Sequence, residues 1–179
     1  RDVAALENTE LAAICDIIPE RAQVPAEHFN VPAYTDYKDM LANTPLDAVL
    51  IATPHYDHTP ISIECLGQGI HVLVEKPIAV HVNDALAMID AYKKAREKNP
   101  RIIYAIMFMQ RTYGAYKKIK ELIVKGELGK IVRTSWIITD WYRTQHYYDS
   151  GGWRATWKGE GGGVLLNQCP HNLDLYQWL

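Results

Sequence analysis

The sequence predicts an α/β fold in which a parallel sheet is followed by the beginning of a second, α+β domain. Short apolar runs alternate with segments of helical periodicity over the first 110 residues, an order typical of parallel strands joined by crossover helices. After residue 110 a helical segment leads instead into a long β-branched stretch. We therefore place one domain at residues 1–110 and the first part of a second domain, with a predominantly antiparallel sheet, at residues 111–179.

Four apolar runs in the first domain have the length of strands, namely residues 11–14, 47–52, 70–74 and 102–107. Strands that are buried on both faces appear as continuous apolar runs. Segments with helical periodicity lie between them, at residues 20–29, 36–42, 61–66 and 83–98. Right-handed crossovers then give a parallel sheet whose strands end at a common edge.

Single residues predict details of two of these helices. Pro25 lacks a backbone donor, so the helix at residues 20–29 is expected to be interrupted there. In the helix at residues 83–98, Ala85, Leu86 and Ile89 are expected to face the core. Basic side chains crowd the end of that helix, where the helix dipole favours cations.

The second domain is expected to begin with a helix at residues 113–125, which Gly126 closes. Residues 130–139 are rich in β-branched side chains, which predicts a strand of an antiparallel sheet. Residues 140–163 are rich in Gly, Trp and Tyr and are interpreted as a structured loop over a site. A final helix runs to the last residue.

The composition is that of a soluble globular protein. The chain has 179 residues, 48% of them apolar, and a net charge of -2 from 19 basic and 21 acidic side chains. This balance gives no electrostatic case for binding nucleic acid or an anionic membrane. No window approaches the roughly 20 apolar residues of a membrane-spanning helix. Three dispersed cysteines are typical of reduced thiols in an intracellular protein, so a cytoplasmic location is expected.

Asp16 follows the first apolar run. An acidic side chain at this point of a parallel sheet can accept hydrogen bonds from the adenosine ribose hydroxyls of NAD and would repel the 2'-phosphate of NADP. The alternative is that Asp16 only caps the following helix. Both interpretations stay open. No glycine-rich turn of the G-x-G-x-x-G type precedes Asp16, because the first glycine is Gly67.

Thr53, Pro54 and His55 follow the second apolar run, and His58 lies three residues further on. Ligands of open α/β sheets bind at the carboxyl ends of the strands, so these residues are predicted to contact a cofactor. His55 and His58 also have the spacing of a metal pair, but the sequence offers no third ligand and no metal site is predicted. The other alternative is a capped helix start after a tight turn.

Glu75, Lys76 and Pro77 follow the apolar run at residues 70–74. Pro77 restricts the backbone of Lys76 to extended conformations. An exposed charge pair at a strand end is usually only solvated. Here the lysine shares the carboxyl edge with the residues described above, which favours a position beside the nicotinamide, where its ammonium can stabilise a substrate oxygen.

Three glycines, Gly161 to Gly163, precede Asn167 and His171. Glycines permit close backbone approach to a ligand, and the alternative is an ordinary flexible turn. A spacing of four residues places Asn167 and His171 on one helix face, unless a helix begins near Pro170 instead. Histidine is the natural proton acceptor at neutral pH for a hydroxyl that is being oxidised.

The loop before these glycines is rich in aromatic side chains and includes an arginine: Trp141, Tyr142, Trp153, Arg154 and Trp157. Such a loop can stack on the apolar faces of a sugar or polyol ring, and packing is the equal alternative. The residues predicted to contact the substrate are Arg111, Trp153, Arg154, Asn167 and His171.

Together these motifs resemble the Gfo/Idh/MocA family of NAD(P)-dependent oxidoreductases. Most of the chain fits the family, and its Glu-Lys-Pro signature is intact at residues 75–77. The resemblance implies a Rossmann-type cofactor domain followed by an α+β substrate domain. It also implies the catalytic lysine and histidine roles for Lys76 and His171, and a supporting role for Asp174 in the last helix.

The sequence departs from the family pattern in two ways. Asn167 occupies a position that is usually aspartate, and an amide can orient a hydroxyl or His171 but cannot take a proton. The first strand, the glycine-rich loop and most of the second domain's sheet are not in the sequence, which is therefore expected to be truncated at both ends. The chain alone is expected to bind NAD poorly and to be inactive.

The resemblance implies hydride transfer between NAD, or alternatively NADP, and a secondary hydroxyl of a sugar, cyclitol or glycoside. Lys76, His171 and Asn167 would be the catalytic residues. The predicted cofactor site comprises Asp16, Thr53, Pro54, His55, His58, Glu75 and Lys76. Two alternatives remain: an NAD-dependent glycosidase acting by transient oxidation and elimination, and a non-catalytic NAD- or sugar-binding protein. The expected partners are a small-molecule sugar or polyol and, in the full-length parent, further copies of the chain.

Overall fold

The computed structural model describes residues 3–139 and 142–179 and confirms an α/β fold with parallel strands. The first part of the chain contains η1 (Val3–Ala5), β1 (Ile14–Cys15), α1 (Pro19–Phe29), β2 (Ala33–Tyr34), α2 (Tyr37–Asn43), β3 (Ala48–Ile51), η2 (His55–Asp57), α3 (His58–Gly67), β4 (His71–Val74), α4 (Val82–Lys98) and β5 (Tyr104–Ile106). The second part contains η3 (Met109–Thr112), α5 (Gly114–Val124), α6 (Gln145–Asp149), α7 (Trp157–Glu160), α8 (Val164–Asn167) and α9 (Pro170–Trp178). None of the described helices combines the length and apolar character needed to cross a membrane.

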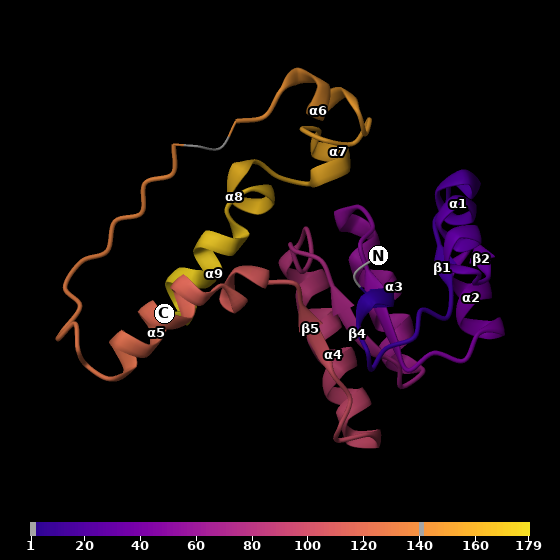
Figure 1. Cartoon of the computed structure of the whole chain (residues 1–179), viewed down its shortest axis with the longest axis horizontal. Helices are drawn as coiled ribbons and strands as arrows, with labels where there is room; N and C mark the ends of the chain where they lie inside the picture. Colours follow the sequence, from indigo (N-terminus) through magenta and orange to yellow (C-terminus); the bar gives the residue numbers. More distant parts are fainter. Residues whose placement is uncertain (1–2, 140–141) are drawn as a thin grey trace.

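The strands form two parallel sets (Figure 1). β3, β4 and β5 make a three-stranded sheet in that order, with Ala48 opposite His71 and Val72 opposite Tyr104. β1 and β2 pair with each other. The sequence predicted the other four strands but not β2, and the run predicted at residues 11–14 overlaps β1 only at Ile14. The parallel order brings the carboxyl ends of β3, β4 and β5 to one edge, where ligands of such sheets bind.

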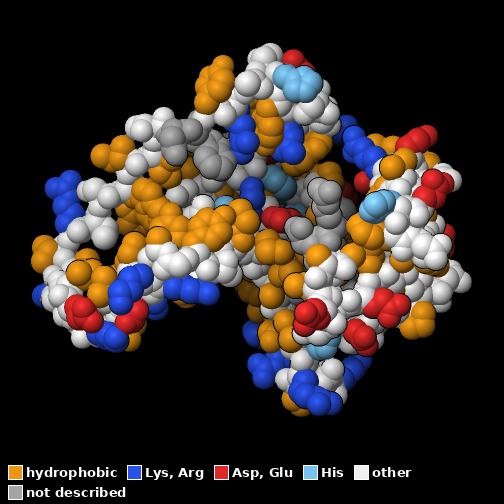
Figure 2. All heavy atoms as spheres, viewed as in Figure 1, with side chains coloured by type: hydrophobic (Ala, Val, Ile, Leu, Met, Phe, Trp, Pro, Cys, Tyr) orange, Lys and Arg blue, Asp and Glu red, His pale blue; other side chains and the backbone are white. Residues whose placement is uncertain are grey.

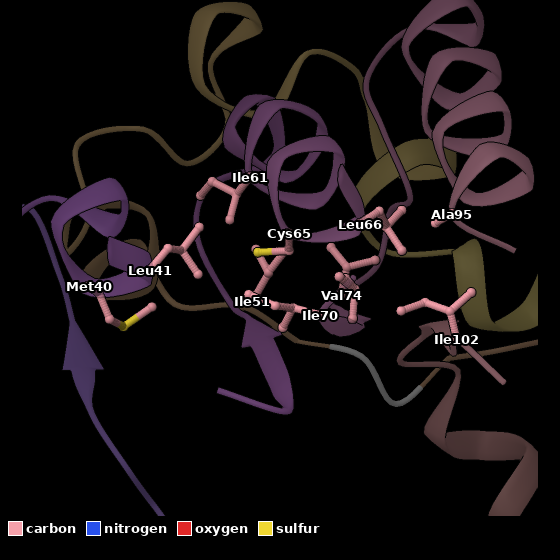
Figure 3. Close-up of a cluster of buried hydrophobic side chains, with 11 residues drawn as sticks. Met40, Leu41, Ile51, Ile61, Cys65, Leu66, Ile70, Val74, Ala95 and Ile102 are labelled. Carbon is pink, nitrogen blue, oxygen red and sulfur yellow. The ribbon is translucent and has the colours of Figure 1, made fainter. Parts of the chain in front are cut away.

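The core packs against the three-stranded sheet (Figure 3). Its buried side chains come from α2, α3, α4 and the strands with the residues just before them: Met40, Leu41, Ile51, Ile61, Cys65, Leu66, Ile70, Val72, Val74, Ala95 and Ile102. Apolar burial is the main favourable term in folding. Because Val74 at the end of β4 is fully buried in this cluster, the loop that follows β4 leaves the sheet from a fixed point.

The predicted interruption of the first helix is wrong, because α1 continues through Pro25. Proline in a helix interior removes one hydrogen bond and is usually destabilising. Ala22 and Ala26 lie one turn apart and are only 1% and 2% exposed. Close packing at these two small side chains holds the helix together across the proline.

The predicted inward face of α4 is also wrong in part. Leu86 and Ile89 are 53% and 37% exposed, whereas Met88 and Ala95 are buried at 0% and 7%, and Ala85 is half-buried. Met88 and Ala95 are seven residues apart, which is two helical turns. The buried face of α4 is therefore the one that carries Met88 and Ala95. Apolar content alone did not distinguish this face of the helix from the adjacent face that carries Leu86 and Ile89.

The predicted strand at residues 130–139 does not form in the part of this segment that the structure describes. Figure 1 shows an extended arc that leads from α5 towards α6. Val132 and Ile137 are 88% and 83% exposed. A strand needs a neighbour to satisfy its backbone donors and acceptors, and none of the described residues pairs with this segment. β-branched composition alone therefore did not produce a sheet.

Candidate functional site

His58, the first residue of α3, joins the loops that follow β3 and β4. Its ring is fully buried. Nδ1 lies 2.8 Å from the main-chain oxygen of Pro77, and Nε2 lies 3.0 Å from the main-chain oxygen of Thr53. A neutral imidazole carries one N–H and donates to one of these oxygens, whereas a protonated ring donates to both. Through these contacts His58 connects the two loops. Its predicted contact with a cofactor stays a prediction.

Lys76 reaches from the end of β4 to α8. Its Nζ donates to the main-chain oxygen of Asn167 at 2.9 Å, and its backbone N–H donates to Oε2 of Glu75 at 3.2 Å. Burial lowers the pKa of Lys76, the carboxylate of Glu75 opposes this change, and the guanidinium of Arg143 adds to it. An ammonium has three donors, and the bond to residue 167 uses one of them.

His55 connects the loop after β3 to the glycine-rich segment. Its ring is 4% exposed, and its Nδ1 lies 2.9 Å from the main-chain oxygen of Glu160. The next residue, Gly161, has a φ of 74°, and a Cβ at this position would overlap the side chain of Val80. Both facts require glycine. Gly161 therefore allows the segment to approach the β4 loop closely, rather than forming an ordinary flexible turn.

His171 lies in the first turn of α9, which begins at Pro170 and is separate from α8. The alternative of a new helix at Pro170 is thus confirmed, and Asn167 and His171 do not share one helix. Burial lowers the pKa of His171 below its usual 6.5, the Lys76 ammonium lowers it further, and Glu75 opposes the change. The ring is therefore neutral at neutral pH, which is the form that can accept a proton.

The side chain of Asn167 points to a carboxylate. Its Nδ2 donates to Oε1 of Glu160 at 2.5 Å, and the two residues are 6% and 5% exposed. The predicted role of Asn167 in contact with substrate stays a prediction. Glu160 was not among the predicted site residues, and its only signal in the sequence was its position next to three glycines.

Arg111, predicted to contact the substrate, is held by the last helix. Its Nε and Nη2 donate to the two carboxylate oxygens of Asp174 at 2.7 and 2.5 Å. The guanidinium also lies 5.8 Å from the ring centres of Phe108 and Trp178. This bidentate pair fixes α9, and hence His171, against η3. Asp174 thus supports the helix as the resemblance implied, and the substrate contact of Arg111 remains a prediction.

The aromatic loop is folded around an arginine. Nη1 of Arg154 donates to the hydroxyl of Tyr147 at 2.6 Å, and its guanidinium lies over the rings of Tyr147 and Trp153. Trp153 also contacts His55 edge to face, at 5.3 Å between ring centres. Figure 2 shows basic and histidine side chains gathered in the hollow beneath α6 and α7.

The other aromatic residues of this loop contribute less to the hollow. Tyr142 and Trp157 are 84% and 78% exposed. Trp141 lies outside the described residues. Trp153 therefore packs against His55 while Trp157 lies at the surface, and stacking of these rings on a sugar remains a prediction.

Asp16 follows β1, and its Oδ1 accepts a hydrogen bond from the backbone N–H of Ile18 at 2.9 Å. Ile18 is itself the N-cap residue of α1, and no side chain among the described residues caps this helix, so the capping alternative is wrong. A carboxylate has two oxygens, so this bond does not use up its capacity to accept. Hydrogen bonding of Asp16 to a ribose remains a prediction.

Two family models match the chain. One describes an oxidoreductase family with an NAD-binding Rossmann fold and covers residues 2–99, and the other describes the GFO/IDH/MocA C-terminal domain and covers residues 116–179. The chain belongs to the Gfo/Idh/MocA family. Its N-terminal part is accordingly an NAD-binding Rossmann unit, which confirms NAD as the cofactor of this fold.

Several members of the Gfo/Idh/MocA family are similar to the chain. An inositol 2-dehydrogenase of Salmonella typhimurium is 30% identical over 127 residues, or 70% of this chain and 37% of that protein. The WlbA dehydrogenase of Bordetella pertussis, solved with NADH and UDP-GlcNAcA, has a TM-score of 0.81 and 30% identity, covering 96% of this chain and 51% of that one. A levoglucosan dehydrogenase solved with NADH and levoglucosan has a TM-score of 0.78 and 26% identity, covering 94% and 44%. The chain thus spans about half or less of the length of these relatives.

Two buried polar side-chain atoms of this Gfo/Idh/MocA chain are candidates for contact with a ligand. The side-chain atoms Thr53 Oγ1 and His171 Nδ1 are buried, and no hydrogen-bond partner reaches either atom from residues 3–139 or 142–179. Buried polar atoms are normally hydrogen-bonded, so a bound ligand is expected to satisfy them. In the same described ranges, no three His, Cys, Asp or Glu side chains are grouped to hold a metal ion.

Proposed function

We propose that the protein carrying this chain transfers a hydride between NAD and a secondary hydroxyl of a sugar or cyclitol. The observation that carries the proposal is the 2.9 Å hydrogen bond from Nζ of Lys76 to the main-chain oxygen of Asn167, which brings the lysine to the segment that leads into His171. Lys76 supplies a positive charge and His171 a proton acceptor. An alcohol oxidation needs both at the reacting oxygen.

Each side chain has a proposed step. A bound NAD would supply the acceptor for the hydride that leaves the carbinol carbon. His171 takes the hydroxyl proton on an imidazole nitrogen, so that the C–H and O–H bonds break and a C=O bond forms. Lys76 donates to the substrate oxygen and stabilises the negative charge that develops there. Asn167, whose amide cannot take a proton, orients the hydroxyl or the imidazole.

The substrate class is proposed from the loop over the site and from the relatives. Trp153 is half-buried beside His55, with Arg154 stacked on it, and an aromatic face of this kind suits the apolar face of a sugar ring. The relatives named above act on inositol or were solved with UDP-GlcNAcA or levoglucosan. Arg111 and Arg154 are proposed as further contacts of the substrate's polar groups.

NAD, rather than NADP, is the cofactor that Asp16 favours. Its carboxylate lies after β1 and keeps one oxygen available beyond the bond to Ile18, and a carboxylate there would repel a 2'-phosphate. We propose that the nicotinamide half of the same site is lined by residues at the ends of β3 and β4, namely Thr53, Pro54, His55, His58 and Glu75. Self-association and a cytoplasmic location remain predictions.

The test is a turnover assay with NAD and a panel of cyclitols, sugars and sugar nucleotides, followed by NADH absorbance. We expect NADH to accumulate with at least one of them and the product to be a ketone. Cleavage of a glycoside without net NADH would instead support the glycosidase alternative. If the protein binds NAD and a sugar but transforms none of the panel, the non-catalytic alternative is supported and the proposal is wrong.

A further inference from the structure

Glu160 is a buried carboxylate that the steps above do not use. It is 5% exposed, and a buried charge is costly unless it is paired or hydrogen-bonded. Its Oε1 accepts from Nδ2 of Asn167 at 2.5 Å. The two residues lie seven positions apart on either side of the three glycines, so this bond closes the glycine-rich segment on itself.

The pair lies between the two side chains that reach over from the strand edge. His55 bonds to the main-chain oxygen of Glu160, and Lys76 donates to the main-chain oxygen of Asn167. Burial lowers the pKa of Lys76, and the carboxylate of Glu160 is one of the two that oppose this. Glu160 therefore stabilises the charged form of the lysine without making a direct bond to it.

The chemistry of the partners fixes the orientation of the amide. An asparagine donates through Nδ2 and accepts through Oδ1, while an ionised carboxylate only accepts. Nδ2 must therefore be the atom that faces Glu160. This leaves Oδ1 as the one side-chain atom of Asn167 that can accept a hydrogen bond from a hydroxyl or an imidazole.

We infer that Glu160 is a positioning residue of the site, which holds the amide of Asn167 in one orientation and supplies the negative charge that Asn167 lacks. The inference rests on the proposed function, because it concerns the same reacting hydroxyl. It makes the identities of residues 160 and 167 interdependent: one must be an acid and the other an amide, in either order.

The test is an exchange of the two groups. In Asn167→Asp, two carboxylates meet at hydrogen-bond distance, so we expect kcat to fall by roughly tenfold to a hundredfold while the Kd for NAD stays unchanged. In Glu160→Gln the pair keeps a hydrogen bond but loses its charge, so a smaller fall is expected. The double variant Glu160→Gln/Asn167→Asp restores one acid and one amide and should recover most of the kcat lost in Asn167→Asp. If the kcat of the double variant is no higher than the value expected from the two single-variant losses acting independently, the inference is wrong.

A second readout needs no turnover. The pKa of Lys76 is followed by NMR after isotopically labelled reductive methylation. Glu160→Gln should lower that pKa further, because it removes an opposing charge, and the double variant should return it towards the original value. An unchanged pKa in Glu160→Gln would contradict the inference even if no substrate is ever found, so failure of this step and failure of the proposed function can be told apart.

The matched control is the exposed amide–carboxylate pair on α1, where Nε2 of Gln23 donates to Oε1 of Glu27 at 3.0 Å. Gln23→Glu also brings two carboxylates together, but water screens them. We expect it to leave kcat and the pKa of Lys76 unchanged. An equal loss in the control would mean that the effect at residue 167 reflects general destabilisation, and the inference would fail.

Discussion

The ammonium of Lys76 donates a hydrogen bond to the main-chain oxygen of Asn167, at 2.9 Å. The two residues are 91 positions apart, so this one bond joins the Rossmann unit to the segment that carries His171. A main-chain acceptor places no demand on the side chain at 167. The lysine can therefore be held in the same place whether residue 167 is an asparagine or an aspartate.

Replacing Lys76 with methionine is predicted to lower kcat/KM by about a hundredfold to a thousandfold, because the charge that stabilises the substrate oxygen is lost. The Kd for NAD should change little, because methionine keeps most of the side-chain volume. Steady-state kinetics and a cofactor titration check both statements. Lys93→Met is the control, since the Lys93 side chain is 70% exposed on α4. Equal kcat/KM values for Lys76→Met and Lys93→Met would show that Lys76 takes no part in the reaction.

Lys76→Met is also predicted to raise the pKa of His171. Burial and the neighbouring ammonium both lower that pKa. Removal of the ammonium takes away one of these two effects and leaves burial. Protonation of His171 should then begin at a higher pH than in the unmodified protein. NMR titration of the histidine ring measures this directly and needs no substrate. A pKa that stays the same or falls would mean that the two side chains do not act on each other.

The sequence was sufficient to predict the residues at the strand ends, because the place of a strand end in a parallel sheet follows from local pattern. His55 and Lys76 could be placed at one edge on that basis. Glu160 could not be predicted, since its importance depends on one contact with Asn167 and nothing local distinguishes it from an exposed glutamate. Apolar content likewise could not show whether Leu86 or Met88 faces the core, because the neighbouring helix decides which stripe is covered.

His58→Ala is predicted to destabilise the protein by about 2–4 kcal/mol, through the cavity it leaves and the buried carbonyls it no longer serves. The lost contacts are those to Thr53 and Pro77. Urea unfolding measures the change. His28→Ala on the exposed side of α1 is the control and should stay within about 0.5 kcal/mol of the original protein. Similar values for the two variants would show that His58 does not connect the loops.

Arg111 and Asp174 are predicted to show a coupling of about 1–2 kcal/mol in a double-mutant cycle with alanine. The Asp174 side chain is 9% exposed and the Arg111 side chain 43%, so Arg111→Ala should cost more than a surface ion pair does. If Arg111 also contacts the substrate, its loss should raise KM beyond the effect of Asp174→Ala. Equal changes of KM in Arg111→Ala and Asp174→Ala would show that Arg111 only holds α9 in place and does not contact the substrate.

Stability is predicted to fall as the pH drops below about 6.5, the usual value for histidine. Burial lowers the pKa of both His55 and His171 in the folded protein. Below the unfolded pKa the unfolded chain therefore binds protons that the folded chain does not, which favours unfolding until the folded pKa values are passed.

His55→Asn keeps a donor in the place of Nδ1 for the oxygen of Glu160 but does not titrate, so it should reduce the dependence of the unfolding free energy on pH. Urea unfolding at a series of pH values checks this, with His55→Gln, whose amide replaces Nε2 instead, as the comparison. A slope in His55→Asn as steep as that of the unmodified protein would show that His55 does not contribute to the acid sensitivity.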